Sequence, residues 1–325
     1  MNLHHALFSL VPPARAWVLS LNHWLRHYQN VTWLVGDGRS GTTWISDLLK
    51  HGRSYREMFE PFHPRLVEGM GFLAPHQYVR PEDSHPKLER AASDVFSGRF
   101  RNRRVDSGNR SMVYRGLLIK DIFANLFSRW ASLRFPSVRI VLLLRNPFTV
   151  ALSKQKLPTW HWVTEPLDLL NQTPLYQDHL RPFEDLIRKT SREGDFISRQ
   201  VLIWSIINYV PLRQFGPEQI RTVFYEDVVA NPSAEISSIR RFVEPNTNSE
   251  EAYLPPETVA RPSRVVRVPG ERIGDIASLA AWKNELTTRQ IDTGRDILGC
   301  FGFGKLYDDA SMPVHSVLSG VRSWS

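Results

Sequence analysis

A glycine-containing segment near the N-terminus has the composition of an anion-binding loop. Residues Gly36–Thr43 read GDGRSGTT and lie between a short apolar run and a helical pattern. A glycine turn in this position points backbone N–H groups and the positive end of the helix dipole at an anion. Arg39 adds a fixed cation, and Thr42 and Thr43 add hydroxyl donors. We therefore predict that this segment binds phosphate.

The spacing of this segment is that of a P-loop that has lost its catalytic lysine. In the pattern G-x-x-x-x-G-x-[ST], Thr42 stands where nucleoside-triphosphate enzymes carry lysine. The strand-end aspartate that binds Mg²⁺ in those enzymes is also missing, because the apolar run Val138–Leu144 ends in Arg145. An arginine can bind a second phosphate, and Ser153 follows it by about two helical turns. The sequence thus predicts phosphate binding without a metal ion.

Four segments resemble, in the same order along the chain, the sulfotransferases that use 3′-phosphoadenosine 5′-phosphosulfate (PAPS). GDGRSGTTW at 36–44 resembles their 5′-phosphosulfate loop, and LLLRNPFTVALS at 142–153 resembles their 3′-phosphate motif. FYEDVVANP at 224–232 is similar to the strand whose tyrosine lines the adenine site, and AWKNELT at 281–287 to a C-terminal segment of the family. The resemblance implies that PAPS is the sulfuryl donor.

The resemblance also implies which residues bind this donor. They are Arg39, Ser40, Gly41, Thr42, Thr43, Trp44, Arg145, Ser153 and Tyr225. Trp44 and Tyr225 would contact the adenine ring, and Arg145 and Ser153 the 3′-phosphate. Negative charge grows on the leaving 5′-phosphate during sulfuryl transfer, so preorganised donors must stabilise it. Arg39 is a candidate catalytic residue for this reason.

A general base is needed as well, because the acceptor hydroxyl loses its proton as it attacks. The segment FEPFH, Phe59–His63, resembles one that follows the phosphate loop of carbohydrate-type sulfotransferases, in which the glutamate is the candidate base. Glu60 is expected at the end of a strand, where ligands bind in doubly wound sheets. Glu60 is therefore the preferred base, and the acceptor is expected to be a carbohydrate.

Two other residues remain candidates for the base. Asp121 follows Lys120, which could hold the sulfonate, and His63 could act as a base or bind the acceptor. The cytosolic small-molecule branch of the family has a catalytic histidine two residues after this lysine. Ile122 occupies that position here, so the resemblance to that branch is weaker. Trp160–Trp162 (WHW) offers aromatic faces for an acceptor, although a surface loop is an equal interpretation.

These residues must be positioned by an alternating pattern of strands and helices. Strands are expected at 31–35, 55–59, 117–119, 138–144 and 220–225. Helices are expected at 14–28, 42–50, 122–133, 147–155, 198–215 and 232–242. Such alternation predicts an α/β fold with a central parallel sheet between two layers of helices, as in P-loop proteins. The segments 69–110 and 157–178 are expected to be insertions or lids.

The amino-acid composition narrows the choice of partners and of cellular location. The net charge of 41 − 33 = +8 favours anionic partners, but no nucleic-acid-binding motif accompanies it. The arginine-rich run Arg99–Arg104 is interpreted as a solvated face. A single cysteine, Cys300, excludes an intrachain disulfide and favours a reducing compartment, so a cytoplasmic location without a membrane segment is expected.

The combined prediction is a single sulfotransferase domain spanning residues 1–325. Its core is expected at about 31–305, with a helical extension at 1–30 and a tail at 306–325. The predicted reaction is transfer of the PAPS sulfuryl group to an acceptor hydroxyl, of a carbohydrate or else of a lipid or small natural product. A P-loop kinase with degenerate motifs is the alternative class. The sequence does not indicate the oligomeric state.

Overall fold

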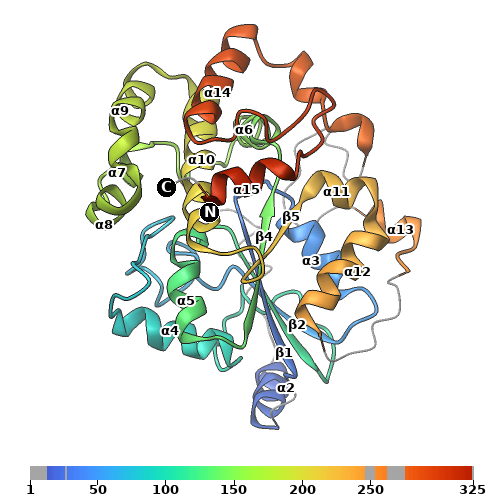
Figure 1. Cartoon of the computed structure of the whole chain (residues 1–325). Helices are drawn as coiled ribbons and strands as arrows, with labels where there is room; N and C mark the ends of the chain where they lie inside the picture. Colours follow the sequence, from blue (N-terminus) through green and yellow to red (C-terminus); the bar gives the residue numbers. More distant parts are fainter. Residues whose placement is uncertain (1–12, 26–27, 246–252, 262–274, 324–325) are drawn as a thin grey trace.

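The computed structural model describes residues 13–25, 28–245, 253–261 and 275–323 (Figure 1). Within them, five parallel strands form one sheet in the order β2-β3-β1-β4-β5. The strands are β1 (Asn30–Gly36), β2 (Tyr55–Phe59), β3 (Gly116–Asp121), β4 (Val138–Leu144) and β5 (Arg221–Phe224). The expected parallel sheet is confirmed, and each expected strand is present within two residues of its predicted ends.

Helices occupy most of the remaining described residues. The longer ones are α2 (Pro13–Trp24), α3 (Thr42–Lys50), α4 (Pro86–Phe96), α5 (Ser128–Arg134), α6 (Pro147–Gln155), α9 (Glu184–Glu193), α10 (Phe196–Gln214), α11 (Tyr225–Ala230), α12 (Pro232–Val243), α14 (Thr288–Cys300) and α15 (Ser316–Ser323). Short ones are α7 (Leu167–Leu170), α8 (Thr173–Leu175) and α13 (Pro256–Val259). Single turns lie at η1 (Asn125–Phe127), η2 (Tyr176–Leu180), η3 (Arg181–Phe183), η4 (Ile276–Ser278) and η5 (Ala281–Asn284).

Helices cover both faces of the sheet, which gives the expected three-layer α/β fold (Figure 1). Successive strand residues point to opposite faces, so Trp33 and Val35 of β1 pack in one core and Leu34 packs in the other. The first core holds side chains of α4, α6, α10 and α14, and the second holds those of α3, α11 and α12. Both faces of each central strand are therefore buried, which explains the uninterrupted apolar runs.

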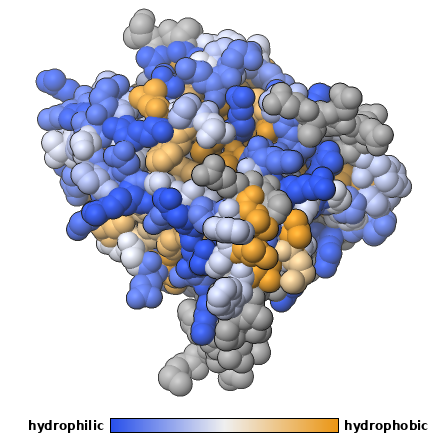
Figure 2. Space-filling model, turned by 90° about the horizontal axis from the view of Figure 1, so that it is seen from below, coloured by the Kyte–Doolittle hydropathy of each residue, from blue (hydrophilic) through white to orange (hydrophobic). Residues whose placement is uncertain are grey.

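The ends of the chain differ from expectation. The expected N-terminal helix is present as α2, but its large apolar side chains Trp17, Leu21 and Trp24 are exposed, while Leu19 is buried. Figure 2 views this end of the molecule, whose largely hydrophilic surface carries a smaller hydrophobic area. The expected C-terminal tail instead contains α15, whose Leu318 is buried in the first core. Among the described helices, none is long and apolar enough to cross a membrane.

The expected insertion at 69–110 is packed against the sheet rather than lying loose over it. It contains α4, and its last part, the 98–110 segment, is fixed to β2 by a buried ion pair. Arg56 Nε lies 2.9 Å from Asp106 Oδ1, and both side chains are at most 3% exposed. The Asn109 side chain accepts from Glu57 N at 2.8 Å and donates to Glu57 O at 2.9 Å. The 98–110 segment therefore has a fixed position beside β2.

The carboxyl ends of all five strands meet at one edge of the sheet, as parallel pairing requires. The loop Gly36–Thr43 leaves β1 there, and Glu60 follows β2. Lys120, the next-to-last residue of β3, lies next to Phe59, its register partner in β2. Arg145 follows β4 and Tyr225 follows β5. Parallel strands thus bring the predicted residues at the five strand ends to one place, at the switch point where such folds bind ligands.

Candidate active site

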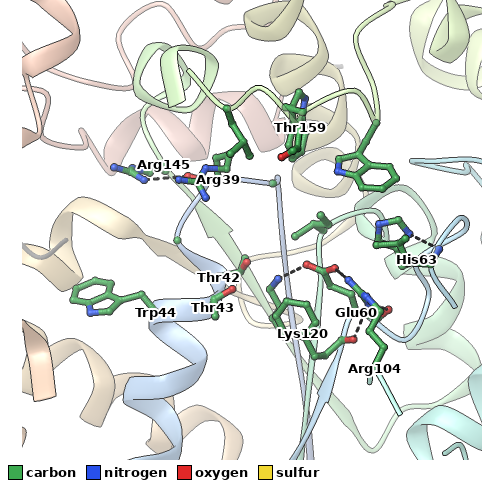
Figure 3. A pocket seen from close by; sticks show the side chains of 18 of the residues that line it. Arg39, Thr42, Thr43, Trp44, Glu60, His63, Arg104, Lys120, Arg145 and Thr159 are labelled. Carbon is green, nitrogen blue, oxygen red and sulfur yellow. Dashed lines mark hydrogen bonds and ion pairs between the residues drawn. The ribbon is translucent and has the colours of Figure 1, made fainter. Parts of the chain in front are cut away.

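A pocket of about 310 Å³ opens at this edge of the sheet (Figure 3). Ten of the predicted site residues line it: Arg39, Gly41, Thr42, Thr43, Trp44, Glu60, His63, Lys120, Arg145 and Tyr225. Arg145 and Arg39 lie at one end of the view, and Glu60, Arg104 and His63 at the other (Figure 3). Ser40, Asp121 and Ser153 are close by in the chain or in space but are not among the lining residues.

The phosphate loop has a backbone that only glycine suits at two positions. Gly41 has φ of +89°, and a Cβ there would lie 2.5 Å from Cδ2 of Tyr225. A Cβ on Gly38 would lie 2.2 Å from the ring of Trp160. The two aromatic rings therefore lie directly on the loop backbone, and a residue with a side chain would force them away.

The N-terminus of α3 faces this pocket without a side-chain cap. Its N-cap residue is Gly41, which accepts no hydrogen bond through a side chain, and its first turn carries no acidic residue. Helices α6 and α10 are capped instead by the side chains of Asn146 and Asp195. The first N–H groups of α3 and the positive end of its dipole are thus available to an anion.

A buried ion pair fixes the start of the loop. Lys154 of α6 donates to both carboxylate oxygens of Asp37 at 2.7 and 2.8 Å, and both side chains are 1% exposed. The ammonium group also lies 4.9 Å from the ring centre of Trp160. This pair connects the end of β1 to the helix that carries Ser153.

The two predicted phosphate motifs contact each other. Arg39 Nε donates to Ser153 Oγ at 2.9 Å, and Arg145 Nη1 donates to the carbonyl oxygen of Arg39 at 3.0 Å. The guanidinium of Arg145 also lies over the ring of Tyr225, 4.2 Å from its centre. The hydroxyl of Ser40 is buried and finds no hydrogen-bond partner among the described residues. Two cations therefore lie beside the uncapped helix terminus.

Two aromatic residues close this end of the pocket. The rings of Trp44 and Tyr225 lie 5.2 Å apart at 56°. Trp44 Nε1 donates to the carbonyl oxygen of Val259 at 3.0 Å, which holds the indole in one orientation. The pair that the resemblance assigns to adenine is thus in contact, and both rings line the pocket.

At the other end, Glu60 is held between two cations. Lys120 Nζ donates to Glu60 Oε1 at 2.6 Å, and Arg104 Nη2 donates to Glu60 Oε2 (Figure 3). Glu60 has φ of +51°, a conformation that places its side chain in the pocket at the cost of backbone strain. Burial by itself raises the pKa of Glu60, but Lys120 and Arg104 together lower it to about 2. Glu60 is therefore a carboxylate at neutral pH.

His63 lies beside Glu60 as a neutral ring. Its Nδ1 accepts from the backbone N–H groups of Arg65 and Leu66, both at 3.2 Å. Because backbone N–H groups can only donate, the proton of the neutral ring is on Nε2. Burial lowers the pKa of His63 to about 4. In this state His63 offers an N–H donor to a ligand and has no free basic nitrogen.

Asp121 faces the core next to the pocket. Its carboxylate accepts from Trp33 Nε1 at 2.9 Å and from Phe62 N at 3.2 Å. Burial raises the pKa of Asp121 to about 7. Its contacts hold the backbone of the Phe59–His63 segment.

Of the WHW segment, the two tryptophans line the pocket and His161 is exposed. Trp162 packs edge-on against His63, with ring centres 4.8 Å apart. Together with Leu157 and Trp160, it forms an apolar wall opposite the strand ends. Among the described residues, no group of three or more His, Cys, Asp or Glu side chains is gathered as metal ligands would be.

The sequence analysis missed Arg104, Asp37 and Lys154. Arg104 belongs to the arginine-rich run interpreted as a solvated face, yet it reaches the pocket and binds Glu60. Lys154 directly follows Ser153, and Asp37 lies inside the glycine loop. Their positions within the two phosphate motifs were the available signal, but opposite charges 117 residues apart do not reveal a pair without the fold.

Comparison with known proteins gave one family and several distant structures. Residues 33–248 match the model of a sulfotransferase family, while the comparison with curated proteins gave no match. Similar solved structures include a sulfotransferase from Alicyclobacillus acidocaldarius, with 14% identity over 83% of this chain and 96% of that one, and a TM-score of 0.38. The sulfotransferase domain from the curacin biosynthetic pathway has the same identity and coverage and a TM-score of 0.44. A retinol dehydratase in complex with androsterone and the inactive cofactor PAP has 12% identity over 89% and 88%, and a TM-score of 0.43.

Proposed function

This chain belongs to the sulfotransferase family, and we propose that its donor is PAPS, its acceptor a carbohydrate hydroxyl and its general base Glu60. The observation that carries the proposal is one pocket with an uncapped helix N-terminus at one end and a buried carboxylate at the other. The first suits a leaving phosphate, and the second suits a hydroxyl that must lose its proton. We also propose that the described residues from about 31 to 305 form the core of one catalytic domain.

The residues present fit the two phosphates and the adenine of PAPS. The α3 terminus has no side-chain cap, and the buried hydroxyl of Ser40 has no hydrogen-bond partner in the part of the chain that the structure describes. Arg39, Thr42 and Thr43 would bind the 5′-phosphosulfate and stabilise the charge that develops on leaving. Arg145 and Ser153 would bind the 3′-phosphate, and the Trp44–Tyr225 pair the adenine ring. PAPS supplies an activated sulfuryl group when bound.

In the proposed reaction, Glu60 takes up the proton that the acceptor hydroxyl loses. The acceptor oxygen forms a bond to sulfur, and the bond from sulfur to the 5′-phosphate oxygen breaks with its electron pair left on phosphate. The hydroxyl proton passes to the carboxylate of Glu60, which is ionised at neutral pH. Lys120 Nζ, 2.6 Å from Glu60 Oε1, orients the carboxylate, and because Lys120 lines the same pocket as the loop it would stabilise the sulfonate. His63 would donate from Nε2 to the acceptor.

The carbohydrate acceptor is supported by two features. The Phe59–His63 segment resembles that of carbohydrate-type enzymes, and Trp160 and Trp162 offer ring faces on which sugars stack. A lipid or small natural product is the competing acceptor for the same chemistry. A cytoplasmic location is part of the proposal, supported by the exposed free thiol of Cys300.

The experiment is a transfer assay with labelled PAPS and mass-spectrometric detection of sulfated acceptors. Glu60→Gln keeps the shape of the side chain and removes its basicity, so turnover is expected to fall by roughly 10²–10⁴. Affinity for adenosine 3′,5′-bisphosphate (PAP), the product, is expected to stay the same, because the donor contacts are at the other end of the pocket.

Asp121→Asn is the matched control, since Asp121 is buried near Glu60 but does not line the pocket. It is expected to retain most of the activity if it folds, which its melting temperature reports. An inactive, folded Asp121→Asn together with an active Glu60→Gln would reject Glu60 as the base and remove the main support for a carbohydrate acceptor.

A further inference from the structure

We infer that the acceptor carries a negatively charged group near the hydroxyl that is sulfated, and that this group binds Arg104 and releases Glu60. The inference rests on the proposed function, because it concerns the acceptor end of the same pocket. It adds a substrate class, anionic hydroxyl compounds, and a positioning residue that the motifs did not indicate.

Arg104 differs from the other cation at Glu60 in its exposure. The side chain of Lys120 is 3% exposed, whereas that of Arg104 is 25% exposed at the rim of the pocket. The Arg104 guanidinium lies 5.1 Å from the ring centre of Phe59 and donates weakly to the carbonyl oxygens of Phe59 and Glu60. Arg104 is therefore the more accessible of the two cations to an incoming ligand.

The position of Arg104 is built into the fold. Its backbone N–H donates to the side chain of Asn102 at 2.9 Å, and the carbonyl oxygen of Val105 accepts from Phe59 N at 2.9 Å. The next residue, Asp106, forms the buried pair with Arg56. These contacts fix the backbone on both sides of Arg104. They keep its guanidinium beside the carboxylate of Glu60, whereas an arginine on a solvated face would need no such contacts.

This arrangement holds the base in an unreactive state. Lys120 and Arg104 each occupy one oxygen of Glu60, so both oxygens already accept charged hydrogen bonds. A carboxylate with a pKa of about 2 takes a proton from a hydroxyl poorly. An anion that binds Arg104 frees Oε2 and removes one of the two cations that lower this pKa. An anionic acceptor would thereby improve its own base.

The surroundings of Arg104 favour the same class of acceptor. Among the described residues that line the pocket, Glu60 is the only acidic one, against the four cations Arg39, Arg104, Lys120 and Arg145. The donor end accounts for Arg39 and Arg145 (Figure 3). The lining also includes the apolar and aromatic side chains of Phe59, Leu66, Ile122, Leu157, Trp160 and Trp162. A molecule with an apolar or ring-shaped body and one anionic group complements these residues.

The test compares acceptors that share a body and differ in charge. Three pairs are used with PAPS: glucuronate and its amide, 4-hydroxyphenylacetate and its amide, and 10-hydroxydecanoate and its amide. For the bodies that are sulfated, kcat/KM of the anionic member is expected to exceed that of the neutral member by about 10–150-fold, the effect of one charged hydrogen bond. Arg104→Gln is expected to remove this preference, and Arg104→Lys to retain part of it.

The pH dependence of kcat/KM is a second readout. It distinguishes release of Glu60 from simple binding of the anionic acceptor to Arg104. In Arg104→Gln, Glu60 keeps only Lys120, so the acidic limb of kcat/KM is expected to move to higher pH. His63 and Lys120 face the same carboxylate and are unchanged in this variant. Arg101→Gln is the control, because Arg101 is exposed in the same segment and does not line the pocket. Melting temperature and PAP affinity report on folding.

Equal or better sulfation of the neutral members by the wild-type protein would overturn the inference, as would an anion preference that survives in Arg104→Gln. Either result still shows a sulfated product, so the proposed sulfuryl transfer would stand.

Discussion

Arg145 and Arg39 hold each other in place at the donor end of the pocket. Arg145 donates to the Arg39 carbonyl oxygen and lies over Tyr225, while Arg39 donates to Ser153. Each guanidinium therefore has a fixed orientation before any anion arrives. Preorganised donors lose little conformational entropy on binding, which increases affinity for a doubly phosphorylated ligand.

We expect Arg145→Ala to weaken PAP binding by about 1.5–3 kcal/mol, the range for hydrogen bonds to charged groups. Isothermal titration calorimetry measures the change. Arg139→Ala is the control, because Arg139 is an exposed arginine on the same strand, β4. Full PAP affinity in Arg145→Ala would reject the assignment of this residue to the 3′-phosphate.

The sequence predicted most of the residues that line the pocket, because motif residues at strand ends must converge when the strands are parallel. It did not predict the state of Glu60. The pairing with Arg104 joins residues 44 positions apart through a loop whose path depends on the buried Arg56–Asp106 pair. Local sequence shows which groups could ionise, but charge and burial around them depend on the tertiary structure.

At the scale of elements, the turn from β1 into α3 determines how the donor end is built. Gly41 combines a positive φ with close contact to the ring of Tyr225. Gly52, just after α3, also has a positive φ, at +65°, but no atom of the described residues lies within 4 Å of an added Cβ. Substitution of Gly52 therefore tests backbone strain alone, whereas substitution of Gly41 tests strain together with crowding against the Tyr225 ring.

We expect Gly52→Ala to lower the free energy of unfolding by about 1–2 kcal/mol, the cost of a left-handed alanine. Gly41→Ala adds displacement of Tyr225, roughly 1–3 kcal/mol more for overpacking. It should also weaken PAP binding, because Arg145 rests on that ring. Urea denaturation and calorimetry measure the two effects. Equal stability losses in both variants would show that Gly41 is not crowded.

Strands and helices could be predicted from the sequence where all of their faces are buried alike. Strands β1 and β4 are buried on both faces, so their residues are almost all apolar and their ends are marked by Gly36 and Arg145. The expected helix at 122–133 begins later, as η1 and α5, because the chain bends at residues 122–123. Helix α4 was not expected, because its polar face and the surrounding prolines resemble a loop.

For the molecule as a whole, the pair Asp37–Lys154 joins the central strand to α6 across the end of the sheet. Its partners are both 1% exposed, so removal of one leaves a buried charge. Lys156, two residues further, pairs with Glu285 at the surface, where both side chains are 40% exposed. Substitution of each lysine therefore shows how strongly burial affects the contribution of an ion pair to stability.

We expect Lys154→Met to lower the free energy of unfolding by about 3–5 kcal/mol, as is typical when one partner of a buried pair is removed. Lys156→Met should change it by about 0–1 kcal/mol, as for exposed pairs. Urea denaturation monitored by circular dichroism compares them. Similar small losses in both variants would mean that Asp37 is neutralised without its lysine at little cost.

The position of β1 in the middle of the sheet has a consequence for synthesis of the chain on the ribosome. Both of its neighbours, β3 and β4, come later in the sequence, so β1 has no partner until Gly116 and the residues after it have emerged. The 116 − 36 = 80 residues between them take roughly 4–16 s to translate at about 5–20 residues per second. For that interval the nascent chain exposes an apolar strand containing Trp33, Leu34 and Val35, the kind of segment that pairs with copies of itself. The yield of native protein is therefore expected to fall when this strand meets other nascent chains before β3 and β4 are made.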